Sequence, residues 1–386
     1  MNTPPVPPLQ LRVDDDPSAL PADAWNALLD ASPRPTPFMR LAYLQALHDS
    51  GSAVPETGWQ PQFLSLWEQD RLVAACPAYL KSHSYGEYVF DWAWAEAYQR
   101  HGLPYYPKLL VAVPFTPVPG SRLLARDATA RALLAQGLEA LAQQLTLSSA
   151  HVLFEDEQDQ ATLAEAGWLA RSQVQFHWTG DGQPCAWPDF LQRLQRDKRK
   201  KIQQEQRRVR EAGIRFERLE GEAIREQDWD FFHHCYTLTY RAHRSQPYLT
   251  RDFFGRMARH MPQHWLMFVA WRGDQRIACS LLAIDPLRRV AYGRYWGTVE
   301  QVPCLHFDAC YYQPLQWCLA GGWLRFEGGA QGEHKMARGL LPVRTQSSHW
   351  LAHPQFHDAV ARHLAREQLA MDEYVDELDA HRPFKS

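Results

Sequence analysis

The chain has 386 residues, of which 45% are hydrophobic and 22% charged, a globular composition with room for two domains. Its net charge of −3 provides no overall field to attract nucleic acid or a membrane surface, so any anion-binding site must be local. No apolar run approaches the length of a transmembrane helix. The seven cysteines form no CxxC pair, which favours free thiols in a cytoplasmic protein.

The first half of the chain is predicted to begin with an arm and to continue as helix and strands. Residues 1–21 are Pro-rich and lack the charged and apolar regions of a signal peptide, so we expect a flexible arm. A helix-type pattern follows at 37–47, and 63–81 alternates as a β-hairpin. We expect a strand at 88–94 and a long loop, rich in Pro and aromatic residues, at 98–124.

A polar helix is predicted between the two halves, within residues 189–219. The segment contains no proline, and Gly213 follows its polar run at the position of a helix C-cap. From Arg196 to Glu211 it has eight basic residues and three acidic ones. Four contiguous cations point to all sides of this helix, so we expect some of them to bind an anionic ligand such as phosphate. The alternative is that all four are exposed to solvent and bind nothing. They are Lys198, Arg199, Lys200 and Lys201.

The second half is predicted to alternate helices and strands in a mixed pattern. Pro314 interrupts the helix expected near 305–320, which must either kink there or begin later. An amphipathic helix is expected at 358–381. The other predicted elements are helices at 227–243 and 250–260, and strands at 264–271, 276–284, 289–296 and 323–327.

The two halves resemble each other, which indicates an internal duplication. Trp67 and Trp271 are 204 positions apart, and so are the members of two further aromatic pairs. Downstream the offset becomes 172, so the first copy carries an extra segment, which we assign to 98–124. The further pairs at 204 are Tyr88 with Tyr292 and Trp92 with Trp296, and those at 172 include Gly167 with Gly339 and His177 with His349.

The duplication predicts an α/β protein in which each copy forms a mixed sheet flanked by helices. We expect an N-terminal arm with the first helix at 1–30 and a first domain at 31–185. A basic linking helix at 186–213 would lead to a second domain with the C-terminal helix at 214–386.

Five stretches carry a resemblance to a known family, and they span most of the chain after residue 30. The sequence resembles tandem GNAT (N-acetyltransferase) proteins of the Fem type, which are aminoacyl-tRNA-dependent peptidoglycan ligases. It is most similar to the FemAB-like N-acyltransferases. The stretches are "LKSHSYGEYVFDWAWAEAYQRHGLPYYPKLL" (80–110), "RDKRKKIQQEQRRVREAGI" (196–214), "YGRYWG" (292–297), "LHFDACYYQ" (305–313) and "EGGAQGEHKMARGLLPVRTQSSHW" (327–350).

The resemblance implies two tandem GNAT-like domains and transfer of an acyl or aminoacyl group from an activated carrier to an amine, without metal. No tightly bound cofactor is implied, and the donor would be a co-substrate. Acetyl-CoA-dependent GNAT enzymes carry a Q/R-x-x-G-x-G/A loop, whereas residues 297–307 read "GTVEQVPCLHF". This departure favours aminoacyl-tRNA as donor over acyl-CoA or acyl carrier protein. A non-catalytic module that binds RNA or another anion is the second alternative.

The main candidate site is "EGGAQGEHKMARG" at 327–339, which the repeat places after a central strand of the second copy. Amide groups at a helix start there would attract a phosphate or an oxyanion, and the first copy has no glycine pair at this point. We therefore expect the second copy to hold the working site. Its expected helix is 333–338, its glycines are Gly328, Gly329 and Gly332, its base candidates are Glu327, Glu333 and His334, and its anion clamps are Lys335 and Arg338.

Two more groups of residues complete the predicted site. Asp91 and Tyr295 align between the copies at the ends of two strands expected to be equivalent, where a tyrosine could donate to a leaving group. Sheet packing is the alternative role for both. Acceptor binding is assigned to residues near the same sheet end. The acceptor set is Lys81, His83, Ser84, Glu87, Trp92 and Trp296.

Metal and nucleophile chemistry is not expected. His349, His353 and His357 mimic metal-ligand spacing, but Pro354 interrupts the helix that would align them. No G-x-S-x-G elbow is present, and no cysteine lies in a setting that would activate it.

Overall fold

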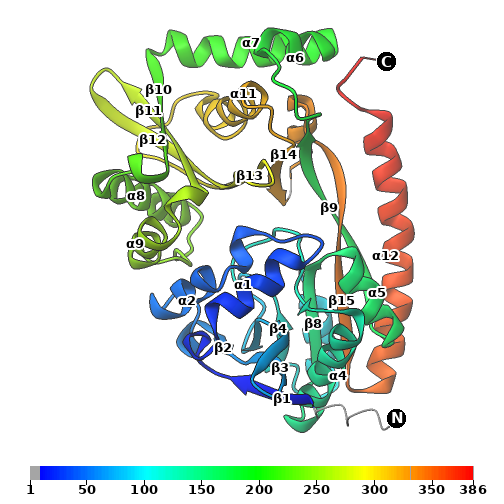
Figure 1. The fold of residues 1–386 in the computed structure, drawn as a ribbon. Helices are drawn as coiled ribbons and strands as arrows, with labels where there is room; N and C mark the ends of the chain where they lie inside the picture. Colours follow the sequence, from blue (N-terminus) through cyan, green and yellow to red (C-terminus); the bar gives the residue numbers. More distant parts are fainter. Residues whose placement is uncertain (1–8, 331, 386) are drawn as a thin grey trace, which may run out of the picture. The chain divides into compact units, whose positions relative to one another are not determined.

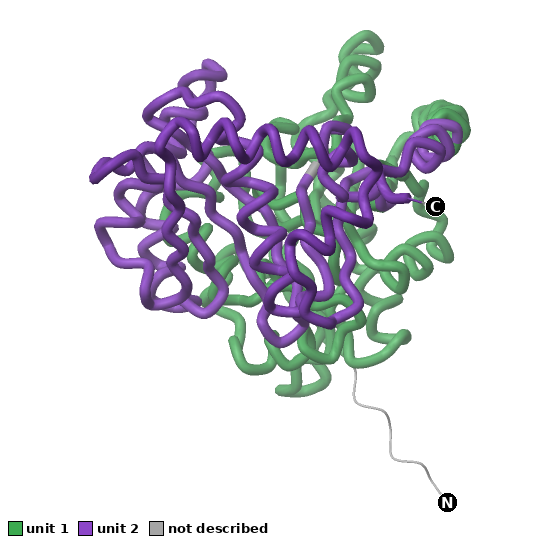
Figure 2. Tube along the Cα trace, turned by 90° about the horizontal axis from the view of Figure 1, so that it is seen from above, with its two compact units in different colours: residues 1–173, 345–372 green, residues 174–344, 373–386 purple. Residues whose placement is uncertain are grey.

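The computed structural model of the chain describes residues 9–330 and 332–385 (Figure 1). It forms two compact units, drawn in two colours in Figure 2. Unit 1 consists of residues 1–173 and 345–372, and unit 2 of residues 174–344 and 373–386. The chain therefore passes three times from one unit to the other. No helix in the described ranges is long and apolar enough to cross a membrane.

Unit 1 contains two sheets, with strand orders β1-β3-β4-β7 and β15-β8-β6-β5-β2. Helix α4 packs Leu134 and Leu138 into an aliphatic core against both sheets, and Asp127 caps its start by accepting from the Ala130 amide at 2.8 Å. The elements are β1 (Leu9–Asp14), α1 (Ala22–Ala31), α2 (Leu41–Asp49), β2 (Trp59–Pro61), β3 (Phe63–Glu68), β4 (Arg71–Cys76), β5 (Ala78–Lys81), α3 (Trp92–Arg100), β6 (Lys108–Val111), β7 (Leu124–Ala125), α4 (Ala128–Gln144), β8 (Ser149–Glu155) and α5 (Glu157–Glu165).

Unit 2 is built on strands in the order β10-β11-β12-β13-β14-β9. Strands β10 to β13 are antiparallel neighbours, β13 and β14 are parallel, and β14 and β9 are antiparallel. The elements are α6 (Trp187–Arg193), α7 (Arg196–Glu211), β10 (Ile214–Glu220), α8 (Glu226–Ala242), α9 (Arg251–His260), β11 (Trp265–Arg272), β12 (Gln275–Asp285), β13 (Val290–Thr298), α10 (Leu305–Phe307), α11 (Gln313–Ala320), β14 (Arg325–Ala330) and a 3-10 turn (Glu333–Arg338).

Three elements run through both units: β9 (Leu169–Thr179), β15 (Leu341–Leu351) and α12 (Pro354–Ala380). In unit 2, β9 pairs with β14, and in unit 1, β15 pairs with β8. The last strand of each sequence copy thus pairs with the penultimate strand of the other copy. For this reason the units do not follow the linear division of the chain.

The elements predicted in the second half are present with small shifts at their ends. The expected helix near 305–320 consists of α10, a π-helical turn (Asp308–Tyr312) and α11, and Pro314 follows the π-helical turn in the first turn of α11, where proline is tolerated. The expected 333–338 helix is the 3-10 turn, closed by Gly339 in the left-handed conformation with φ 88°.

Two expectations for the first half are wrong. The flexible arm expected over residues 1–21 is wrong for Leu9–Asp14, which form β1 and pair with β3, and residues 1–8 lie outside the described residues. Residues 88–94 form no strand, because α3 begins at Trp92 and buries Trp94 and Tyr98 one helical turn apart. The aromatic spacing that matched a strand of the second copy therefore belongs to a helix face.

Strand pairing also relocates the extra segment of the first copy. Strand β6 is antiparallel to β5 and parallel to β8, as β13 is antiparallel to β12 and parallel to β14. The partner of β13 is therefore β6, and the extra residues precede it, at 82–107. The assignment of the extra segment to 98–124 is therefore wrong for residues 108–124, and it omits residues 82–97. We call residues 82–107 the inserted segment.

Candidate functional site

In unit 2, a small cavity opens where β13 and β14 separate. The two strands pair only from Val290 to Tyr292, opposite Arg325 to Glu327. Beyond this point they part around a cavity of about 130 Å³, which we call the strand-parting cavity. Tyr295 and Trp296 of β13 line it, as do Phe326 and Gly328 of β14, Ser280 of β12, and His306, Cys310 and Tyr311 from the helical segment. A ligand can enter a mixed sheet at such a gap.

In unit 1, the gap between the equivalent strands β6 and β8 is filled by the segment that follows β6. Strands β6 and β8 pair over three residues and then part, but the segment after β6 returns to the open edge of β8. The Gly120 amide donates to the Phe154 carbonyl at 2.9 Å, and the buried Arg122 donates through Nε to the Leu153 carbonyl at 3.0 Å. This difference favours unit 2 as the unit that binds a ligand between its strands.

Glycine is required at Gly328 because neighbouring atoms leave no room for a side chain, and at Gly332 because the backbone has a positive φ. A Cβ on Gly328 would lie 2.4 Å from Leu340 Cδ2 and 2.9 Å from the Phe176 carbonyl oxygen. Gly332 has φ +99°, a conformation that only glycine adopts easily, and Gly329 also has a positive φ. Of the three, Gly328 lines the strand-parting cavity.

The three predicted base candidates have different surroundings. Glu327 is buried on β14, with Oε1 2.9 Å from Arg325 Nε and Oε2 3.9 Å from His177 Nε2. Glu333 is exposed and accepts from the Tyr374 hydroxyl at 2.8 Å. His334 is exposed, and its Nε2 lies 3.3 Å from the hydroxyl of Tyr311, which lines the cavity.

The two predicted anion clamps are both buried. Lys335 donates to the Gly329 carbonyl at 3.1 Å, and burial lowers its pKa to about 8. Arg338 forms an ion pair with Glu205 of α7 at 2.9 Å, and its guanidinium lies 3.6 Å from the centre of the Phe307 ring. Arg338 therefore ties the 3-10 turn to the basic helix, and its charge is balanced inside the protein.

Sequence reasoning missed several cavity residues, above all His306. Its ring lies edge-on to Trp296 at 5.5 Å and to Tyr311 at 5.7 Å. All the missed side chains from the helical segment fall within "LHFDACYYQ", which was noticed only as a family stretch. Two of them, Cys310 and Tyr311, lie in the π-helical turn, a feature that is frequent at functional sites and that only the structure reveals.

A basic groove lies between α6 and α7, with a volume of about 850 Å³. Of the four predicted cations, Arg199 and Lys200 line this α6–α7 groove, whereas Lys201 is exposed elsewhere and Lys198 pairs with Asp197 at 2.9 Å. The other residues that line it are Trp187, Pro188, Leu191, Gln192, Gln203, Gln204, Gln206, Arg207 and Arg210. No carboxylate is among them, so the groove fits an anionic ligand.

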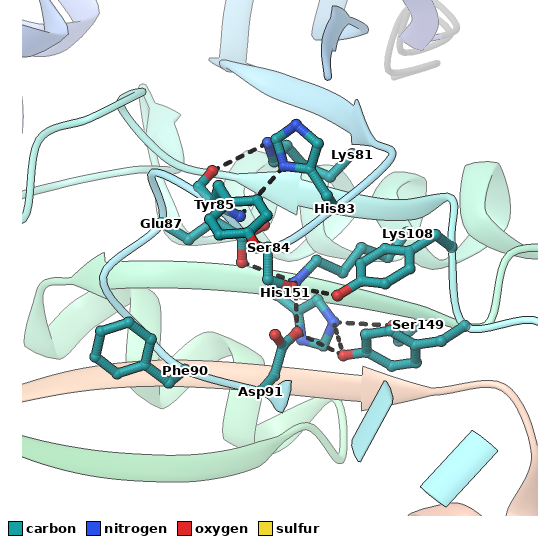
Figure 3. A network of polar contacts seen from close by, with 12 residues as sticks. Lys81, His83, Ser84, Tyr85, Glu87, Phe90, Asp91, Lys108, Ser149 and His151 are labelled. Atoms are coloured by element: carbon teal, nitrogen blue, oxygen red, sulfur yellow. Dashed lines mark hydrogen bonds and ion pairs between the residues drawn. The ribbon is translucent and has the colours of Figure 1, made fainter. Parts of the chain in front are cut away.

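In unit 1, a buried ionic network surrounds Lys108 at the start of β6 (Figure 3). The Lys108 ammonium has no exposure; it donates to Ser84 Oγ at 2.8 Å and to Glu87 Oε2 at 2.7 Å, and it also pairs with Asp91. Asp91 accepts from the Tyr105 hydroxyl at 2.6 Å. Burial opposes the Lys108 charge, but Glu87 and Asp91 outweigh it and raise its pKa.

The same network places most of the predicted acceptor residues close together. Lys81 is buried with its ammonium 3.8 Å from the centre of the Trp59 ring, and burial lowers its pKa to about 7. Burial raises the pKa of Glu87 to about 7. His83 accepts from the Tyr85 amide at 3.2 Å. The sequence did not predict Lys108 or Tyr105, because nothing in a sequence marks a lysine as buried.

Two assignments require correction. Asp91 is not at a strand end: it is the N-cap residue of α3, in the inserted segment, so it is not equivalent to Tyr295. Trp296 lies in unit 2, whereas the other five acceptor candidates lie in unit 1. Trp92 is exposed, with its ring 5.0 Å from that of Tyr85.

The histidines with metal-like spacing have other surroundings. His349 is buried and its Nδ1 is 2.8 Å from Nδ1 of His151, and burial lowers the pKa of both imidazoles. Within the described part of the chain, no group of three His, Cys, Asp or Glu residues could hold a metal ion.

Residues 16–386 match the FemAB-like family, which is described as peptidoglycan biosynthesis/recognition. The solved structure of FemX is similar, with 8% identity over 89% of this chain and 98% of that chain and a TM-score of 0.53. L-PGS from Bacillus licheniformis has 11% identity over 91% and 98% of the two chains and a TM-score of 0.54. A tandem GNAT protein from the clavulanic acid biosynthesis pathway has 12% identity over 90% and 99%, with a TM-score of 0.47. No curated protein matches the chain.

The predicted fold class, mixed α/β with two tandem GNAT-like domains, is confirmed. The family match covers nearly the whole chain, and it confirms the family that the sequence resembles. The chain belongs to the FemAB-like family.

Proposed function

We propose that the protein is an N-acyltransferase that moves an acyl or aminoacyl group from an activated carrier to an amine. The strand-parting cavity carries this proposal, because it lies in the middle of a sheet and is lined by side chains that can hold a carbonyl group. The recorded pairs of β13 and β14 run from Val290 to Tyr292, and the cavity lies beyond them between the two strands, where a developing oxyanion would be bound.

For the donor we propose aminoacyl-tRNA, with acyl-CoA or acyl carrier protein as the alternative. The α6–α7 groove supports RNA, because four cations, four glutamines and one tryptophan are the side chains that contact phosphates, base edges and base faces. Residues 297–307 lack the glycine pattern of the pyrophosphate loop, which supports the same choice.

For the acceptor we propose the surface of the inserted segment in unit 1. Three large side chains stand exposed there: Tyr85 at 60%, Phe90 at 48% and Trp92 at 40%. In the same segment, Glu87 and Asp91 bind the buried Lys108, which fixes this part of the backbone. An exposed aromatic group on a rigid base is a common feature of binding sites.

The test is a transfer assay with labelled donors. Purified protein is incubated with mixed aminoacyl-tRNA, acetyl-CoA or acylated carrier protein and a lysine-containing peptidoglycan precursor peptide. We expect label on the peptide amine from aminoacyl-tRNA, and mass spectrometry identifies the acyl group. Transfer from acetyl-CoA alone would reverse the donor assignment.

The rival function is RNA or anion binding without catalysis, which the α6–α7 groove also supports. That rival predicts tight binding of tRNA and no transfer from any of the three donors. A protein that neither transfers label nor binds tRNA would contradict both functions.

A further inference from the structure

His306 is the titratable side chain of the strand-parting cavity best placed to exchange protons with a ligand. It lies on the cavity wall, and it is exposed and therefore accessible from the cavity. Its ring contacts are aromatic, with Trp296, Phe307 and Tyr311, and within the described residues neither ring nitrogen has a hydrogen-bond partner in the protein. Both nitrogens are thus available to a ligand.

The backbone around His306 is held in an unusual shape. Cys304, just before α10, has φ +69°, which is strained for a residue other than glycine. The π-helical turn follows immediately, and Ser280 Oγ of β12 donates to the Ala309 carbonyl at 2.6 Å. These features fix the position from which the imidazole reaches the cavity, and such strain is concentrated at functional sites.

Two other titratable side chains of the cavity, Cys310 and Tyr311, cannot take a proton at neutral pH. Burial raises the pKa of the Cys310 thiol and of the Tyr311 hydroxyl, so both stay protonated. Arg294 is a permanent cation, and no carboxylate lines the cavity. Glu327 and Glu333 are not among its lining residues.

The charge environment keeps the imidazole neutral. Partial desolvation of the ring lowers the pKa of His306 to about 4, although part of the side chain is exposed, and the positive charges of His334, Arg338 and Lys335 in the 3-10 turn lower it further. Arg294 of β13 lines the same cavity and adds a further positive charge. A bound anionic group would offset these charges and raise the pKa towards the range in which a base is effective.

We propose that His306 is a catalytic residue that shuttles the proton during acyl transfer, an inference that rests on the proposed function. The amine nitrogen forms a bond to the acyl carbon, and the bond from that carbon to the leaving atom of the carrier breaks. The electron pair of the broken bond goes to the leaving atom. His306 accepts the proton that the attacking nitrogen loses and returns it to that atom.

The first test is His306→Gln in the transfer assay, across pH 5 to 9. We expect kcat to fall about 100-fold, a typical loss for a general base, and the acidic limb of the kcat profile, which reports the donor-bound enzyme, to disappear. Donor affinity should change less than about twofold. His260→Gln, an exposed histidine of α9, is the matched control and should behave as the wild type.

The outcomes separate the two proposals. If the wild type transfers an acyl group and His306→Gln keeps both the rate and the acidic limb, the role of His306 is wrong while the function stands. Loss of the limb in His334→Gln alone would assign the base to that residue instead. If the wild type transfers nothing, the proposed function fails and the role of His306 fails with it.

A second measurement needs no substrate. Diethyl pyrocarbonate modifies neutral, accessible imidazoles, and peptide mass mapping locates the product. We expect His306 to react at pH 6 much faster than the buried His151 and His349. A His306 that is as unreactive as those two would overturn the proposal.

Discussion

Glu155 illustrates how one buried carboxyl group can make stability depend on pH. It lies at the end of β8, where Oε1 accepts from Ser348 Oγ at 2.8 Å and Oε2 has no partner. Burial raises its pKa from an ordinary 4.5 to about 8. Between these values the folded protein holds a proton that the unfolded chain releases, so this contribution to stability is lost as pH rises.

We therefore expect Glu155→Gln to stabilise the protein increasingly as pH rises from 5 to 9, by about 4 kcal/mol over that range. The amide keeps the acceptor for Ser348 and removes the charge. Thermal or urea unfolding at several pH values measures the difference from wild type. Glu165→Gln, at an exposed position of α5, is the control and should show no such trend. A constant difference across the pH range would contradict the predicted effect.

At the scale of elements, Lys108 at the start of β6 is a central anchor of the inserted segment. Lys108 binds Ser84, Glu87 and Asp91, all of which belong to the inserted segment. Removing one partner of a buried ion pair leaves charge without compensation and costs about 3–5 kcal/mol. The segment should therefore depend on this side chain more than the rest of unit 1 does.

We expect Lys108→Met to open the inserted segment while the sheets stay folded. Hydrogen exchange followed by mass spectrometry should show faster exchange in peptides covering residues 84–100, and unchanged exchange in β3 and α4. Lys385→Met, an exposed lysine, is the control. Restored protection in the triple variant that adds Glu87→Gln and Asp91→Asn would support the charge explanation. Normal exchange in Lys108→Met would contradict it.

The second-copy elements were predictable because their signals are local. Strand alternation, the helix periods and glycines after the last turn all depend on residues close in sequence. The strand expected at 88–94 failed for the same reason: Tyr88 and Trp92 matched the spacing of a strand, but Trp94 and Tyr98 bury one face of a helix. Alignment to the repeat could not detect that the inserted segment precedes β6.

At the scale of the whole molecule, a slightly acidic protein carries a concentrated basic surface. The net charge is −3, yet the α6–α7 groove is lined by four cations. In the described structure, one of these, Arg207, has an ion pair within α7, with Glu211 at 3.8 Å. Counterion release should therefore dominate any binding of RNA here.

We expect Arg199→Glu combined with Arg207→Glu to weaken tRNA binding at least about tenfold and to flatten its dependence on salt. Fluorescence anisotropy between 50 and 300 mM salt measures both. Arg196→Glu with Arg208→Glu is the matched control, because these exposed cations lie on the same helix outside the groove and the change in net charge is equal. Equal losses in both double variants would mean that only the overall charge of α7 matters.

The sequence by itself determined the family, the duplication, the fold class and most secondary structure, because these depend on local patterns and on order along the chain. Only the tertiary structure decided which residues share a site. In the structure, the last strand of each copy pairs with a strand of the other copy. The gap between β6 and β8 is filled by the chain, whereas the gap between β13 and β14 is open. The tertiary structure also buried Lys108 and placed His306 on the cavity wall. Burial and the separation of strands arise from contacts between residues far apart in sequence, which no local pattern records.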